Sequence, residues 1–64
     1  MDTVEKAIES AYTAQISGLY KVLIQGFARA KSNAQKKTEA QDKFRRGLTF
    51  AAEVRDSARA AAGL

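Results

Sequence analysis

The chain has 64 residues, a net charge of +4 and neither cysteine nor histidine. A domain of this size buries only about 60% of the surface of its unfolded chain, and the missing residue types exclude disulfides and thiolate or imidazole metal sites as a further source of stability. Because serine and threonine also lack a histidine base here, we expect a single non-enzymatic domain over residues 1–64, with no catalytic residues, cofactor or metal, that is stabilised by association with other chains.

The N-terminal segment and the apolar stretches predict a cytoplasmic protein. The first ten residues, MDTVEKAIES, carry acids where a secretory signal would have basic residues and an apolar run. Lys21 and Arg29 interrupt the most apolar segment, residues 19–30, well short of the roughly 20 apolar residues that a membrane span needs. A helix lying on a membrane surface over residues 19–31 is an alternative, which the small number of bases in that segment disfavours.

Residues 3–30 are predicted to form a first helix. Asp2, with Glu5 three residues later, or Thr3 can cap its start. Apolar side chains then recur at spacings of 4, 4, 3, 4, 4 and 3, an eleven-residue repeat that places them on one nearly straight stripe. The members of this stripe are Ile8, Tyr12, Ile16, Leu19, Leu23, Phe27 and Ala30.

A second line of mostly small residues runs beside the stripe. Small residues let another helix approach closely, so we expect the first helix to have one bulky and one tight packing face. A local kink is the alternative explanation for Gly18 and Gly26, since each costs about 1 kcal/mol against alanine in a helix interior. The line consists of Ala7, Ala11, Ala14, Gly18, Val22 and Gly26.

A polar break separates this helix from a second one, predicted over residues 33–61. Ser32 is the expected N-cap, with Gln35 completing a capping box, so the two helices should form an antiparallel hairpin of the all-α class. A single unbroken helix is the alternative, because nothing in the break forbids helix. Gly47 lies beside the second core line and can admit a close neighbour. That line consists of Ala40, Phe44, Leu48, Ala51, Val54, Ala58 and Ala61 or Ala62.

The hairpin creates a mismatch close to its turn. Folding back places residues 23–30, in the most apolar part of the chain, opposite residues 34–41, AQKKTEAQ. Large side chains would then face water, each at a loss of roughly 1.5–3 kcal/mol of burial. We therefore predict a homodimer or higher oligomer, built as a four-helix bundle. Its predicted interface is Ile16, Leu19, Tyr20, Leu23, Ile24 and Phe27.

The entire excess of positive charge lies in residues 31–46, which carry a local charge of +4. Such a segment can attract nucleic-acid phosphates or an acidic protein. The competing interpretation is a solvated helix surface, because Glu39 precedes Lys43, and Asp42 precedes Arg46, at the spacing of intrahelical ion pairs. The basic residues also project around the helix instead of gathering on one face. The predicted contact residues are Lys36, Lys37, Lys43, Arg45, Arg46 and, in addition, Phe50.

Phe50 is singled out because it projects away from the apolar stripes. The other four aromatic residues fall on or beside those stripes, which favours core packing over stacking against nucleic-acid bases. Phe50 is therefore either an oligomer contact or a hot spot for a partner.

These features together predict a small protein-interaction module, such as an adaptor, inhibitor or regulatory subunit. It would act as a helical homo-oligomer and bind another protein. The alternative is a basic nucleic-acid-binding regulator built as a helical hairpin dimer. A third hypothesis is a self-assembling subunit of a secretion filament or phage particle, in which the same apolar surface makes open contacts.

Overall fold

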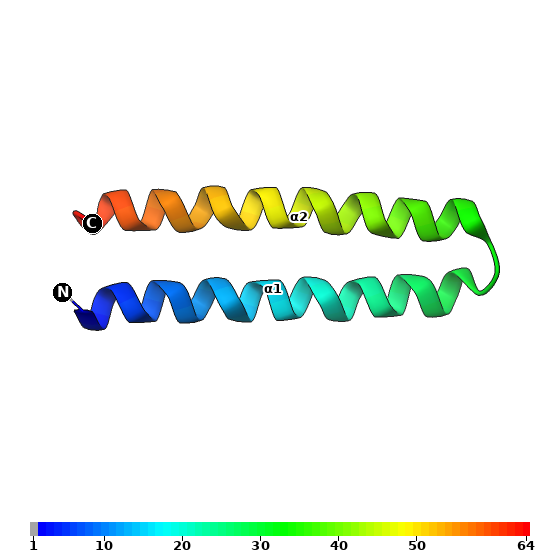
Figure 1. The fold of residues 1–64 in the computed structure, drawn as a ribbon, viewed down its shortest axis with the longest axis horizontal. Coiled ribbons are helices and arrows are strands. Elements are labelled where there is room, and N and C mark those ends of the chain that lie inside the picture. Colours follow the sequence, from blue (N-terminus) through cyan, green and yellow to red (C-terminus); the bar gives the residue numbers. More distant parts are fainter. Residues whose placement is uncertain (1) are drawn as a thin grey trace.

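The computed structural model describes residues 2–64, apart from the side chain of Asp2, as two antiparallel helices joined by a short turn (Figure 1). Helix α1 spans Asp2–Ala30 and helix α2 spans Ala34–Ala61. The backbone measures 48 × 15 × 8 Å along its principal axes. The predicted all-α hairpin is confirmed, with each helix start displaced by one residue, and the single unbroken helix is wrong. Within residues 2–64, neither helix is apolar over enough of its length to cross a bilayer.

The turn reverses the chain by placing one residue in the left-handed region. Lys31 has a φ of 55°, and the N–H group of Asn33 donates to the carbonyl oxygen of Ala30 at 2.8 Å. Asn33 is extended and caps α2, since its Oδ1 accepts from the N–H group of Lys36 at 3.0 Å. The predicted cap at Ser32 is therefore wrong by one residue, because the left-handed Lys31 completes the reversal only at Asn33.

The outer ends of the two helices differ in what the structure describes. The predicted cap at Asp2 or Thr3 lies at the edge of the described residues, and both residues already belong to α1. At the end of α2, Gly63 has a φ of 80°, and the N–H groups of Gly63 and Leu64 donate to carbonyl oxygens one turn back, at 3.1 and 2.9 Å. This Schellman cap pairs two carbonyls that a helix end would otherwise leave free.

The eleven-residue stripe of α1 is the side of that helix that packs on α2. Its six large members are half-buried and Ala30 is buried, as the spacing predicted. Ala30 and Ala51 are nevertheless the only buried apolar residues in the described chain. The core is therefore a single thin line between two helices.

The core line of α2 is confirmed except at one position. Ala51 is buried, while Val54 is 45% exposed. Arg55 takes its place, with the guanidinium carbon 4.4 Å from the centroid of the Tyr12 ring. The reason is the flat aromatic face of Tyr12, which a planar cation covers better than a branched aliphatic side chain does. The other confirmed members are half-buried: Ala40, Phe44, Leu48, Ala58 and Ala62.

Two glycines allow the helices to approach closely. A Cβ atom at Gly26 would lie 2.8 Å from the Cβ of Ala40, and one at Gly47 would lie 2.5 Å from the Cδ2 of Leu19. Close packing therefore explains Gly26 better than a kink does, and Gly47 admits a neighbour as predicted. The same contacts set the register, in which residues 23–30 lie opposite residues 36–43, two residues further along than expected.

The two glycines in the interior of α1 should respond differently to alanine. Gly18 has open space around it, so Gly18→Ala should raise the free energy of unfolding by about 0.5–1 kcal/mol through helix propensity alone. Gly26→Ala gains the same propensity but forces the new methyl group against Ala40. We expect it to be less stable than Gly18→Ala by about 1–3 kcal/mol in urea titrations, and equal stabilities would contradict the close approach.

The turn yields a second stability test. Asn33→Ala removes the cap and should lower the free energy of unfolding by about 0.5–2 kcal/mol. Ser32→Ala is the matched control, because Ser32 is exposed and lies outside the cap. Chemical denaturation monitored by circular dichroism would check both variants. A larger loss for Ser32→Ala than for Asn33→Ala would restore the original assignment of the cap.

Candidate functional site

A groove runs between the two helices in the half of the hairpin that contains the turn. Its volume is about 530 Å³. Half-buried or buried apolar side chains form its floor, and exposed basic side chains stand on its rim. The floor consists of Leu19, Leu23, Ala30, Ala40 and Phe44. A groove of this kind binds aliphatic or aromatic groups on its floor and anionic groups on its rim.

Three cations from both helices form the rim. Arg29 comes from the last turn of α1, while Lys36 and Lys43 are seven residues apart on one side of α2. None of the three forms an ion pair with any described residue, although Glu39 also lines the groove. Their charges are therefore directed to solvent or to a ligand.

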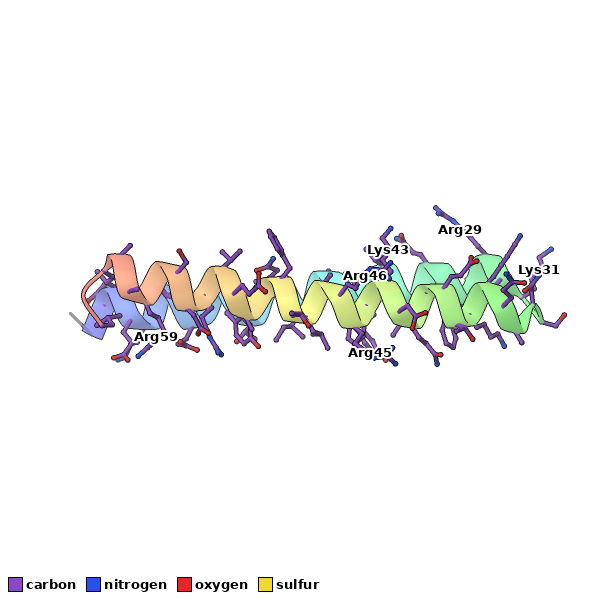
Figure 2. The ribbon with its side chains drawn as sticks, turned by 90° about the horizontal axis from the view of Figure 1, so that it is seen from above. Arg29, Lys31, Lys43, Arg45, Arg46 and Arg59 are labelled. Atoms are coloured by element: carbon purple, nitrogen blue, oxygen red, sulfur yellow. The ribbon has the colours of Figure 1, made fainter. Side chains whose placement is uncertain are left out.

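The hairpin presents its basic side chains unevenly. Figure 2 shows Arg29 and Lys43 extending from one edge, and Arg45 and Arg59 from the opposite edge. Residues 21–46, the half with the turn, contain eight basic and two acidic residues, a net charge of +6. The remaining residues, at the other end of the hairpin, contain three basic and five acidic residues, a net charge of −2. Folding thus gives the molecule a basic and an acidic end.

At the acidic end, one guanidinium links the two helices. The Nη1 of Arg59 donates to the Oε2 of Glu5 at 3.1 Å and to the Oε2 of Glu9 at 3.3 Å. These carboxylates lie one helical turn apart on α1, so a single side chain near the end of α2 reaches both. This contact neutralises part of the negative charge of that end within the hairpin itself.

A second, shallower depression continues the groove toward the acidic end. Ala11 of α1 and Val54 of α2 line it. Val22, which lines the groove, follows Ala11 by eleven residues, and Lys43 precedes Val54 by eleven, which is three full turns in each helix. Both depressions therefore open on the same side of the hairpin, here called the groove face. Phe50, seven residues after Lys43, also projects to it.

The opposite side of the hairpin has its own exposed apolar residues. Tyr20 is 57% exposed and Ile24 is 52% exposed. Both project about 200° away from Val22 around α1, on the side here called the Tyr20 face. The Nζ of Lys37 lies 5.8 Å from the centroid of the Phe27 ring and shields that residue.

The residues of the predicted oligomer interface are divided by the hairpin itself. Tyr20 and Ile24 are exposed as expected, whereas Leu19 packs against Gly47 and is half-buried. The half-burial of Leu23 and Phe27 corrects the expectation that all the large residues near the turn would face water. Ile16 is half-buried as well. Their role in an interface between copies stays a prediction.

The predicted basic contacts are likewise divided. Lys36 and Lys43 meet on the groove rim, Lys37 lies over Phe27, and Arg45 is paired with Asp42 at 2.8 Å. The ion pairs expected at four-residue spacing, from Glu39 to Lys43 and from Asp42 to Arg46, are absent from the described residues. Asp42 pairs with Arg45, three residues away, and not with Arg46, four residues away. On a helix both positions are about equally close to Asp42, so spacing alone does not decide between them. Phe50 is 60% exposed, in agreement with its projection.

Arg29 is the rim residue that sequence reasoning did not select. It lies outside the basic segment and joins Lys36 only because the turn brings the end of α1 beside the start of α2. The hairpin register could have identified Arg29, because it predicts which charged residues of the two helices lie near each other as well as which apolar residues do. Comparisons with known protein families, with curated proteins and with solved structures find no match to this chain.

Proposed function

We propose that the chain is a non-enzymatic protein-interaction module that works as a helical homo-oligomer, in the role of an adaptor, inhibitor or regulatory subunit. One observation carries this proposal: large apolar side chains are exposed on both faces of a hairpin, and only two alanines are buried among the residues that the structure describes. Burying a large apolar side chain contributes about 1.5–3 kcal/mol, so further association has much to gain.

Two exposed faces support two kinds of contact. The groove face carries Val22, Phe50 and Val54, and the Tyr20 face carries Tyr20 and Ile24. A second copy covers one face on each chain, and the other face stays open to a different protein. Tyrosine, which is exposed here at position 20, is one of the residue types that dominate binding energy at protein interfaces.

Self-association should make the stability depend on protein concentration. We expect the thermal midpoint to rise by several degrees over a hundredfold increase in concentration, because association stabilises the folded chain by mass action. Sedimentation equilibrium should show a closed oligomer of constant mass at the upper end of that range. A constant midpoint together with a monomer mass would contradict the proposal. A mass that grows without limit would favour the filament hypothesis.

Nucleic-acid binding is a second candidate because several cations with no ion-pair partner among the described residues gather along one edge. Arg29, Lys36 and Lys43 together could contact phosphates. The apolar floor between them argues for an amphipathic protein ligand instead, since a phosphate backbone gains nothing from contact with Leu23 or Phe44.

The two candidates differ in an electrophoretic shift assay. Under the proposed function, we expect no shift of labelled RNA or duplex DNA at about 0.1 M salt, the range in which phosphate contacts are still readily detected. Binding that the double variant Lys36→Gln/Lys43→Gln loses would favour the nucleic-acid candidate. Arg45→Gln is the matched control, because Arg45 lies on the opposite edge and is paired with Asp42.

A further inference from the structure

We propose that the groove face binds a second copy of the chain in an antiparallel, two-fold arrangement. In this dimer, each groove lies against the acidic half of the other copy, which includes the N-terminal half of its α1. The inference rests on the self-association in the proposed function and specifies its surface and its geometry.

The groove face carries exposed apolar side chains along its length. Phe50 is 60% exposed, and Val4, Val22 and Val54 are each 45% exposed. Val4 precedes Val22 by eighteen residues, which is five full turns, so it lies on the same side of α1. Apolar side chains therefore extend along the whole face, from the acidic end to the groove, as a contact between two whole hairpins requires.

The area of the groove face is sufficient for a stable interface. The face is 48 Å long. At about 10 Å for each of two helices, its area is on the order of 900 Å². A stable interface of standard size buries about 800 Å² on each partner. One face of this hairpin, covered by an identical face, is therefore large enough to hold a dimer together.

The uneven distribution of charge along the hairpin decides how the two copies are oriented relative to each other. Two hairpins with their turns at the same end would bring together two ends of net charge +6. The antiparallel orientation places each such end against an end of net charge −2. The rim cations Arg29 and Lys36 then avoid their own copies, and each lies at the end of the other chain that carries the net negative charge.

The register shows what meets at the two-fold axis. Gly26 lies opposite Ala40 and Leu19 opposite Gly47, so Phe50 lies opposite Ile16, the central residue of α1. The axis therefore passes close to Phe50, and the two copies of this side chain meet there. Each α1 runs along its own equivalent, where the line of small residues permits close approach.

The same symmetry determines which residues fill the grooves. Positions about equally far from the centre of α1 come together, so Val4 lies near Arg29 of the other copy and Ala11 lies near its Val22. The N-terminal half of α1 thus supplies a small, apolar surface to the groove floor. The Tyr20 face points outward in this dimer and stays open to another protein.

Single cysteines test this arrangement directly, because the chain has none of its own. Gln15→Cys lies on the groove face close to the proposed axis, and Thr13→Cys lies at the same height on the opposite flank of α1. Both positions are exposed, so both variants should fold, which circular dichroism would verify. In a glutathione redox buffer, Gln15→Cys should form its disulfide dimer on the order of tenfold faster than Thr13→Cys, because the dimer raises the effective thiol concentration.

A mixture of Val4→Cys and Arg29→Cys tests the orientation. The antiparallel dimer predicts a mixed disulfide between the two variants, identified by its mass. A predominant Val4→Cys homodisulfide would overturn the antiparallel orientation. Faster cross-linking of Thr13→Cys would overturn the choice of face and leave the proposed homo-oligomer intact.

The remaining outcomes concern the occupant of the groove. A stable oligomer in sedimentation with no preference for Gln15→Cys would mean that the groove face is not the self-association surface, and would overturn this inference alone. A monomer at every concentration would overturn both the inference and the proposed homo-oligomer. In that case, binding of RNA or DNA that Lys36→Gln/Lys43→Gln loses would identify nucleic acid as the ligand of the rim.

Discussion

Two helices share only one line of contact, and the other properties of this molecule follow from that constraint. A helix that is apolar around much of its circumference, as α1 is near Leu23, can turn only part of its surface toward one neighbour. Its half-buried stripe is satisfied by α2, while Tyr20 on one side and Val22 on the other stay in water. The hairpin is thus a stable arrangement of the backbone with an incomplete core.

The groove is a consequence of where the helices approach most closely. The contact between Gly26 and Ala40 leaves no large side chain between the backbones at that level, so the groove is lined there by these two residues and by the larger side chains on either side of them. The register that this contact sets also decides which charges converge. Arg29 and Lys36 line the same groove because the turn brings the last turn of α1 beside the first turn of α2. A displacement of the register by one residue would place different side chains opposite each other across the groove.

Much of the fold follows from local pattern. The spacing of apolar residues in α1 predicts all seven members of its stripe, and the polar break at residues 31–33 predicts the hairpin. The details that differ depend on contacts with distant residues or on near-equal choices. Arg55 replaces Val54 because Tyr12 lies across from it, which no pattern within α2 reveals. Asp42 pairs with Arg45 and not with Arg46, and the sequence could not predict this because residues three and four positions away on a helix are about equally close. The candidate site was predicted only in part for the same reason, since Arg29 belongs to it through tertiary structure alone.

The two ends of the hairpin are closed by different kinds of link. At one end, the peptide chain itself passes through Lys31 and Asn33 and cannot separate. At the other, Arg59 holds both Glu5 and Glu9 in a contact that is about half open to solvent. Dissolved ions weaken such a contact and leave the covalent turn unchanged. Added salt therefore weakens the link between the helices where the chain termini lie, whereas the covalent link at the turn does not depend on ionic strength.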